Sequence, residues 1–165
     1  MLHDARAIAN ALLSFGDRTD LPISPLKLQK LIYFTHGHSW RTRGTGLVFN
    51  RFQAWDHGPV VKVVYDAFKD LGFRPIRRRA TWTNFAAGGI EPATATLLDE
   101  EMECIQQSMT IYGPVNADIL SRLSHAAGGP WDTVRKNSAQ FPDGIIPQQL
   151  IEDYFINKFK ELHSQ

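Results

Sequence analysis

Apolar residues recur every three or four positions along most of the chain, which is the spacing of one face of an α-helix. This spacing predicts helices over residues 3–15, 24–42, 59–71, 94–112, 115–124, a short one from residue 131, and 148–162. Alternating apolar and polar residues predict a strand over 49–55 and one or two short strands within 73–86. We therefore expect a mainly α fold: a compact single-domain helical structure with a small β-strand insert.

The segment 24–42 differs from the others because apolar residues cover most of its circumference, a pattern typical of a helix buried on several sides. Ser24 and Pro25 supply its start, since serine caps free N–H groups and proline is well accommodated in the first turn. Gly37 costs about 1 kcal/mol relative to alanine inside a helix, so we expect it to permit the close approach of another backbone. We predict that this helix is the centre of the core.

Composition and charge exclude several classes of protein. The chain has 165 residues, 43% of them hydrophobic, and a formal net charge of +1. A nucleic-acid-binding protein usually carries a marked basic excess, and a disordered protein is poor in apolar residues, so neither class is expected. One cysteine excludes an internal disulfide framework, and no segment has the pattern of a signal peptide or a membrane span.

We therefore expect a soluble, cytoplasmic protein that does not contact a membrane, and the overall charge does not favour nucleic acid as a partner. The predicted elements divide into a domain over residues 1–137 and a C-terminal loop and helix over 138–165 packed on the same domain.

Six histidines make a metal site the first chemistry to consider. His36 and His38 lie two positions apart, so on a helix they point about 200° away from each other and cannot share a metal ion. His57 and His125 are distant in sequence, and no spacing matches a zinc pattern. We predict no metal ion and no cofactor. A metal-dependent or nucleophilic hydrolase using His36, His57 or His125 is the remaining enzymatic alternative.

A nucleophilic enzyme would need an activated serine or cysteine. Ser124, His125 and Asp118 can be combined into a triad, but no G-x-S-x-G motif accompanies them. Cys104 lies among acidic residues, and nearby negative charge raises the pKa of a thiol rather than activating it. We therefore predict no catalytic residue.

The segment Arg77–Arg79, with Arg74 and Trp82 nearby, is the strongest local cluster of charge. One interpretation is a solvated strand edge, where charges discourage pairing between edges. The other is a surface that binds an acidic protein or a nucleic acid. Arg77, Arg78, Arg79 and Trp82 are therefore a candidate partner-binding surface.

The last predicted helix carries a wide apolar and aromatic stripe. Its members are Leu150, Ile151, Tyr154, Phe155, Phe159 and Leu162. Such a stripe packs on the domain's own core or binds a partner chain, including a second copy of the same chain in a homo-oligomer. Both interpretations stay open at this point.

Three segments together resemble a known family. The first is KLQKLIYF over residues 27–34, followed by His36 and Gly37. The second is FQAWDHGPVV over 52–61, followed by Tyr65. The third combines Tyr112–Gly113, LSRLSH over 120–125 and GPW over 129–131. In this order and spacing they resemble the Panacea domain, also called SocA-like or the GepA-type phage-associated family, over residues 3–137.

The resemblance implies an antitoxin of a toxin–antitoxin system, of a kind often carried on prophages. Such a protein neutralises a cognate protein toxin by direct protein–protein binding. An alternative that the resemblance also implies is a protease adaptor that delivers a toxin to ClpXP. The family has no catalytic residues and no cofactor, which agrees with the absence of catalytic spacing in this sequence.

The matching residues can serve as scaffold or bind the partner. They are Gln29, Lys30, Tyr33, Trp55, Gly58, Pro59, Val60, Tyr65, His125, Pro130 and Trp131. As scaffold, Trp55 and Tyr65 would pack on the buried second helix, and Gly58–Pro59 would make a strand-to-helix turn. His125 would donate a hydrogen bond near the start of the sixth helix. On this interpretation the recognition surface lies elsewhere.

Overall fold

A computed structural model describes residues 1–163, except for the side chains of residues 159, 160, 162 and 163. In chain order the elements are α1 (Ala5–Arg18), α2 (Pro25–Arg43), β1 (Phe52–Trp55), β2 (Gly58–Val60), α3 (Lys62–Phe68), the single 3₁₀ turn η1 (Lys69–Leu71), β3 (Thr81–Asn84), β4 (Gly89–Pro92), α4 (Asp99–Tyr112), α5 (Ala117–Ser124), α6 (Pro130–Lys136), β5 (Ile145–Ile146) and α7 (Gln148–His163). The predicted mainly α fold with a few short strands is confirmed. Within the described residues, no helix is both long and apolar enough to cross a membrane.

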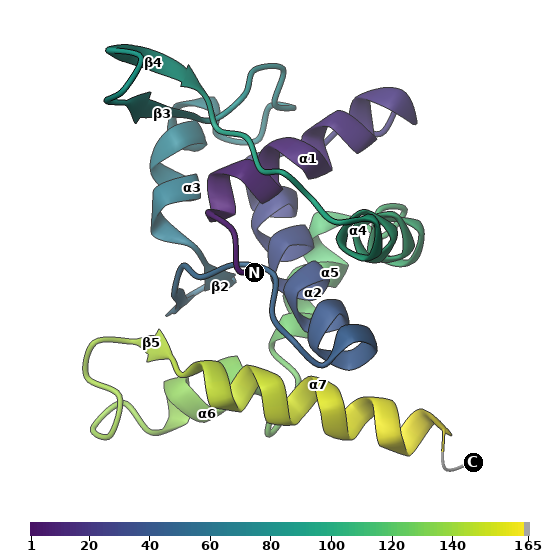
Figure 1. The fold of residues 1–165 in the computed structure, drawn as a ribbon. Coiled ribbons are helices and arrows are strands. Elements are labelled where there is room, and N and C mark those ends of the chain that lie inside the picture. The colour runs from purple at the N-terminus through teal and green to yellow at the C-terminus, as the bar shows by residue number, and fades with distance from the viewer. Residues whose placement is uncertain (164–165) are drawn as a thin grey trace.

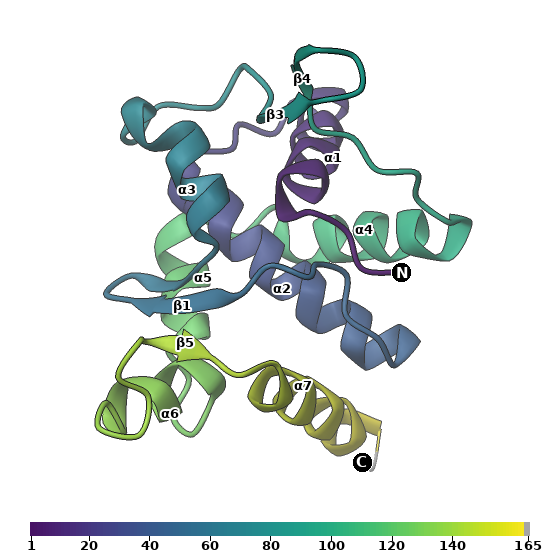
Figure 2. The same ribbon diagram turned by 60° about the vertical axis from the view of Figure 1, so that its left-hand side comes forward.

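Helix α2 runs through the middle of the molecule, and α1, α3, α4, α5 and α7 all contact it (Figures 1 and 2). The Ser24 hydroxyl accepts a hydrogen bond from the Lys27 N–H at 3.3 Å, and Pro25 occupies the first turn. Gly44 ends the helix in the left-handed conformation, with φ of 68°. The prediction of a central, buried second helix is confirmed.

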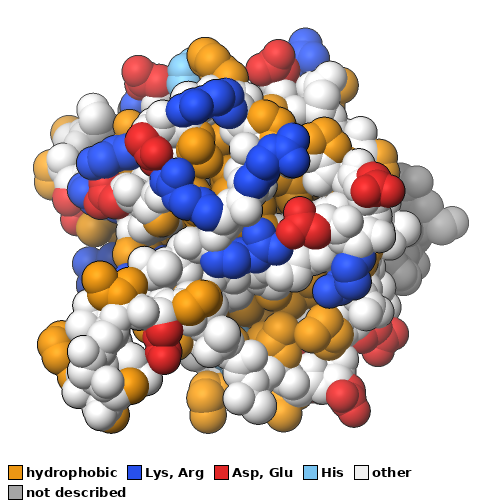
Figure 3. Space-filling view, turned by 90° about the horizontal axis from the view of Figure 1, so that it is seen from above, with side chains coloured by type: hydrophobic (Ala, Val, Ile, Leu, Met, Phe, Trp, Pro, Cys, Tyr) orange, Lys and Arg blue, Asp and Glu red, His pale blue; other side chains and the backbone are white. Residues whose placement is uncertain are grey.

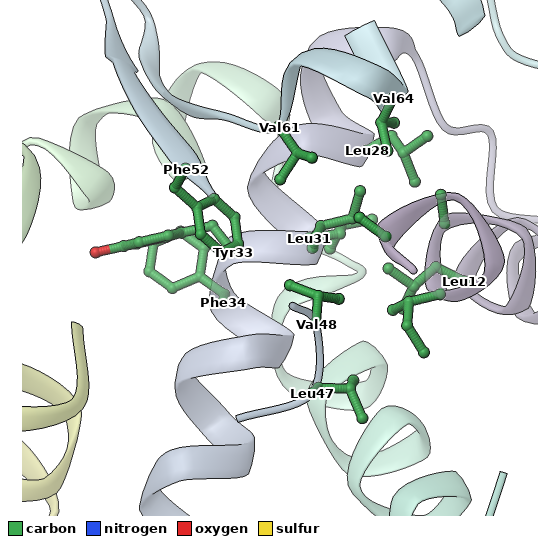
Figure 4. Close-up of a cluster of buried hydrophobic side chains, with 14 of the residues drawn as sticks. Leu12, Leu28, Leu31, Tyr33, Phe34, Leu47, Val48, Phe52, Val61 and Val64 are labelled. Carbon is green, nitrogen blue, oxygen red and sulfur yellow. The ribbon is translucent and has the colours of Figure 1, made fainter. Parts of the chain in front are cut away.

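The core forms where the apolar faces of the surrounding elements meet α2. Leu28 and Leu31 of α2 pack with Leu12 of α1 and Val64 of α3 (Figure 4). Further along α2, the Tyr33 ring makes edge contacts with three neighbouring rings. These are Phe34 at 5.3 Å, Phe52 at 5.5 Å and Phe155 at 5.6 Å between centroids. Aromatic pairs in this geometry stabilise a core beyond the burial of their area.

Helix α7 covers the end of this core, and Gly37 is the reason it can lie so close. The ring of Phe155 sits where a Cβ at position 37 would be. Gly37 therefore permits a close approach, as predicted, but the group that approaches it is the Phe155 ring and not a backbone segment. Ile151 and Phe155 are buried, so this part of the apolar stripe packs on the protein's own core. Phe159 and Leu162 lie outside the described side chains.

The strands form two small antiparallel sheets. One has the order β2-β1-β5, with Gln53 opposite both Val60 and Ile145. Pro59 therefore lies in a strand, and α3 begins at Lys62, so the predicted helix start at residue 59 is wrong. The loop predicted over 138–147 contains the short strand β5. The other sheet is the β3–β4 hairpin, which projects beside α1 and α3 (Figure 1).

The fourth helix begins at Asp99 and not near Thr94 as the sequence predicts. The residues that precede this helix are extended, and hydrogen bonds hold them against α1 and the residue before β3. The Ala93 N–H donates to the Ala80 carbonyl at 2.9 Å, and the buried Asn10 amide donates to both Ala80 and Ala93 carbonyls. The Glu101 carboxylate accepts from the Leu98 N–H at 2.9 Å, which fixes the actual start.

Candidate functional site

Side chains from three helices hold the backbone of the β1–β2 hairpin. Among the described residues, five carbonyls between positions 54 and 61 accept hydrogen bonds from side chains: Ala54 from Arg135, Trp55 from Trp131, His57 from Ser121, Pro59 from Lys30 and Val61 from Gln29. We call these five donors the locking residues. Backbone carbonyls in a hairpin edge usually bond to another strand or to water, so side-chain donors at this density fix the hairpin in one position.

Helix α2 supplies two of the locking residues from its buried face. The Gln29 amide bonds to Val61 in both directions, donating at 3.1 Å and accepting at 2.9 Å. The Lys30 ammonium group donates to the Pro59 carbonyl at 2.7 Å, and the residue is 0% exposed. Burial lowers the pKa of Lys30 to about 7, because the charged form loses its hydration.

Helices α5 and α6 hold the other side of the hairpin. The Ser121 hydroxyl donates to the His57 carbonyl at 2.6 Å, and the Trp131 indole N–H donates to the Trp55 carbonyl at 2.7 Å. Arg135 donates to the Ala54 carbonyl at 3.2 Å and pairs with the Asp56 carboxylate at 2.8 Å. The position of these helices is thereby tied to that of the hairpin.

His125 takes part in this corner by stacking. Its ring lies parallel to that of Trp131, with 3.7 Å between centroids. Its Nε2 atom is buried and has no hydrogen-bond partner among the described residues, so the predicted donor role is not met by this atom. Burial lowers the pKa of His125, and the charges of Lys30, His57 and Arg135 lower it further.

Gly58 permits the hairpin to sit this deep. Its φ is 111°, a conformation that side chains other than glycine rarely adopt. A Cβ here would lie 2.5 Å from the Ser124 hydroxyl oxygen and 3.0 Å from the Lys30 nitrogen. Position 58, directly after the two-residue loop Asp56–His57, therefore requires glycine.

The outer side of the locked hairpin borders an apolar groove of about 630 Å³. Trp55 and Tyr65 form one wall, with their rings edge to face at 4.7 Å between centroids. The remaining lining residues come from α2, the hairpin, α3, the turn after it and α6: Pro25, Leu26, Gln29, Ala54, Asp56, His57, Val60, Val64, Phe68, Lys69, Gly72, Phe73 and Arg135. We call this the Trp55–Tyr65 groove.

The groove changes the interpretation of two motif residues. Tyr65 is 40% exposed and Trp55 is half-buried, so both keep surface open to solvent, and their packing on the second helix stays a prediction. Tyr33 and Val60 are buried, as a scaffold role requires. The motif thus has an inner part that holds the hairpin and an outer part that faces solvent.

Comparison with known proteins identifies the family of the chain. The family model described as "Antitoxin SocA-like, Panacea domain" matches residues 28–132. The chain belongs to this family. Antitoxin SocA of Caulobacter vibrioides (strain NA1000 / CB15N) is 40% identical over 132 residues, which cover 79% of this chain and 70% of that relative. No solved structure matches the chain significantly.

The residues that carry the SocA-like resemblance converge on the hairpin, although they are spread over the sequence. Gln29 and Lys30 come from the first matching segment, the hairpin itself is the second, and Trp131 belongs to the third. Ser121 lies within the third matching segment but is not among the candidate residues, and Arg135 lies outside all three segments. The Asp56–His57–Gly58 sequence after alternating residues is a hairpin signal that could have revealed the turn.

The structure does not assemble the catalytic groups weighed from the sequence. The Ser124 hydroxyl is buried and donates to the Ser121 carbonyl at 2.6 Å, whereas Asp118 is exposed at the start of α5. Cys104 is buried, and burial is the main cause that raises its pKa, ahead of the charge of Glu101. No group of three or more His, Cys, Asp or Glu side chains in the described part of the chain could hold a metal ion.

The remaining helical histidines of the sequence analysis make structural contacts. His36 Nδ1 accepts from the Leu47 N–H at 3.0 Å, and burial lowers the pKa of His36 to about 4, so the ring is neutral. His38 bonds to the Gln107 side chain at 3.1 Å.

The basic segment is a loop before β3, so its interpretation as a strand edge is wrong. Arg78 pairs with Asp70 and donates to the Ala67 carbonyl at 2.9 Å, and Arg79 pairs with Asp17. These contacts tie the loop to α3 and α1. Figure 3 shows Lys and Arg side chains gathered on this face with Asp and Glu side chains among them. The structure places Trp82 beneath the Arg6 guanidinium, whose carbon lies 6.0 Å from the ring centroid.

Proposed function

We propose that this protein neutralises a cognate protein toxin by binding it directly, with the β1–β2 hairpin as the rigid binding element. The observation that supports the proposal is the convergence of the SocA-like motif on one hairpin. Five side chains hold the inner side of that hairpin, and its outer side presents Trp55 to solvent. A binding element that is already fixed loses little conformational entropy when its partner docks.

A binding role without catalysis accords with membership of an antitoxin family. It also accords with how the motif's polar side chains are used. The side chains of Lys30, Ser121 and Ser124 donate hydrogen bonds to backbone carbonyls inside the protein. A hydrolase would need such groups within reach of a substrate.

Co-expression with the product of the adjacent reading frame tests the proposal. We expect that product to stop growth alone, growth to resume when this protein is present, and the two to co-purify. Trp55→Ala should weaken co-purification, whereas Phe85→Ala should not, because Phe85 lies at the far tip of the β3–β4 hairpin and is 90% exposed. A neighbour that is harmless alone and does not co-purify would refute direct neutralisation.

Delivery of the toxin to ClpXP stays an alternative mechanism implied by the resemblance. It differs from direct neutralisation in one measurable respect, the half-life of the toxin. In the proposed mechanism the bound toxin is as long-lived in cells lacking ClpXP as in normal cells. A toxin that accumulates and becomes active only when ClpXP is removed would favour the adaptor mechanism.

A further inference from the structure

The Trp55–Tyr65 groove is lined mainly by apolar side chains. Val60, Val64 and Phe68 are buried beneath it, and the rings of Tyr65 and Phe73 stand at its edge. Tyr65 is 40% exposed and Phe73 is 92% exposed. An exposed apolar surface around a cleft is a common mark of an interaction site.

Lys69 lines the groove and shares the Asp66 carboxylate with Lys62, so this stretch of α3 and η1 beside the groove carries an excess of positive charge. Lys62 and Lys69 both pair with one carboxylate, Asp66, at 2.6 Å and 3.4 Å. Both lysines are more than half exposed, so their charges are available to a partner. On the opposite rim Asp56 and Arg135 form an ion pair at 2.8 Å, so their charges cancel. The groove therefore offers an apolar floor beside one uncompensated positive charge.

We propose, resting on the proposed function, that this groove receives a segment of the toxin that lays a large apolar side chain on the floor and places a carboxylate near Lys62 and Lys69. A small molecule within the groove would leave the almost fully exposed Phe73 ring uncovered, whereas a protein segment extends over it. Opposite charges across such an interface speed association and select the partner.

A second copy of this chain is the strongest competing occupant. The start of α4 carries exposed Leu98 and Met102 among Asp99, Glu100 and Glu103, which has the same chemistry as the segment we infer. A contact between the groove of one copy and α4 of the next is head-to-tail. Such contacts build open chains unless the rotation closes a ring, so we assign the groove to the toxin.

The test compares full-length variants for binding to the purified product of the adjacent reading frame. Tyr65→Ala should weaken binding at least 10-fold, as expected for an aromatic side chain that a partner covers in an interface. Lys62→Glu/Lys69→Glu should slow association about 10-fold at low salt, with the difference shrinking as salt is added. All three positions are exposed, and thermal unfolding of each variant checks that the fold is intact.

The matched control reverses two charges on another face. Arg18→Glu/Arg77→Glu makes the same change in net charge beside the basic loop and should leave binding within 2-fold. Loss of binding in this control alone would assign the toxin to the basic loop and overturn the inference. Binding that survives Tyr65→Ala and the lysine reversal would overturn it while leaving direct neutralisation standing.

Two further results would also decide against it. If the molar mass of the isolated protein rises with concentration, and Asp99→Lys/Glu103→Lys abolishes the rise, a second copy occupies the groove. If the wild type does not bind the neighbouring product at all, the proposed function fails and this inference fails with it.

Discussion

Lys30 is the residue on which the hairpin most depends electrostatically. Its ammonium group is fully buried, and its one described hydrogen bond goes to the Pro59 carbonyl at 2.7 Å. Burying a charge with a single neutral acceptor is costly, so the folded protein favours the neutral amine. A neutral amine still donates its hydrogen bond, and the lock is retained on either side of the pKa of about 7.

Replacing this lysine should change how stability responds to pH. In the unfolded chain Lys30 has a pKa near 10.5, and in the folded protein about 7. Between these values the unfolded state binds more protons, so stability rises with pH. Relative to Lys30→Met, the wild type should gain up to about 1.4 kcal/mol per pH unit between pH 7 and 9.

Urea unfolding at several pH values measures this difference. Because both proteins share every other titrating group, subtraction isolates Lys30. Equal slopes for wild type and Lys30→Met would contradict a depressed pKa at this position.

At the scale of elements, the hairpin and α6 act as one unit. The Trp131 indole donates to the Trp55 carbonyl, and Arg135 from the next turn donates to that of Ala54. Loss of one donor leaves a partly buried carbonyl without a partner. Such a loss costs about 1–3 kcal/mol.

Trp131→Phe keeps an aromatic ring against His125 but removes the indole donor. We expect it to loosen the hairpin locally, and amide hydrogen exchange of Gln53–Val60 should accelerate about 10-fold while amides of α1 remain protected. Tyr65→Phe serves as the comparison, since its hydroxyl is outside the lock and exchange should not change. Uniform acceleration across the whole protein would mean that the lock is not a local unit.

The sequence predicts the helices better than the hairpin and its lock. A helix satisfies its own backbone, so local spacing suffices to find α2 and α7. Strand β5 has two residues and exists only because Ile145 lies opposite Gln53, ninety-two positions away (145 minus 53). Likewise, Lys30 and Trp131 appear in the sequence as motif residues, but their shared target, the hairpin backbone, emerges only in three dimensions.

Over the whole molecule, the core extends beyond the part that the family model matches. Residues 28–132 match, yet Leu12 of α1 and Ile151 and Phe155 of α7 are buried in the same core. The division at residue 137 stays a prediction. Phe155 in particular fills space that Gly37 leaves open.

A chain ending at residue 137 should therefore not fold. It lacks Ile151 and Phe155, and Phe→Ala changes alone cost about 3–5 kcal/mol in buried sites, against total stabilities of about 5–15 kcal/mol. Circular dichroism during heating should show no cooperative transition for residues 1–137. Full-length Lys158→Ala, altered at an exposed position of α7, should unfold like the wild type. A sharp transition in the shortened chain would show that α7 is dispensable.

The positions of the locking residues along the sequence also determine when, during synthesis, the hairpin can be held in its fixed shape. The hairpin is translated early, but its donors extend from Gln29 to Arg135. A ribosome that has completed the hairpin must still add some seventy residues (61 to 135) before the last donor exists, which takes several seconds at about 5–20 residues per second. A nascent or prematurely terminated chain that ends before Arg135 thus carries the hairpin's residues without the complete set of donors that fix its shape.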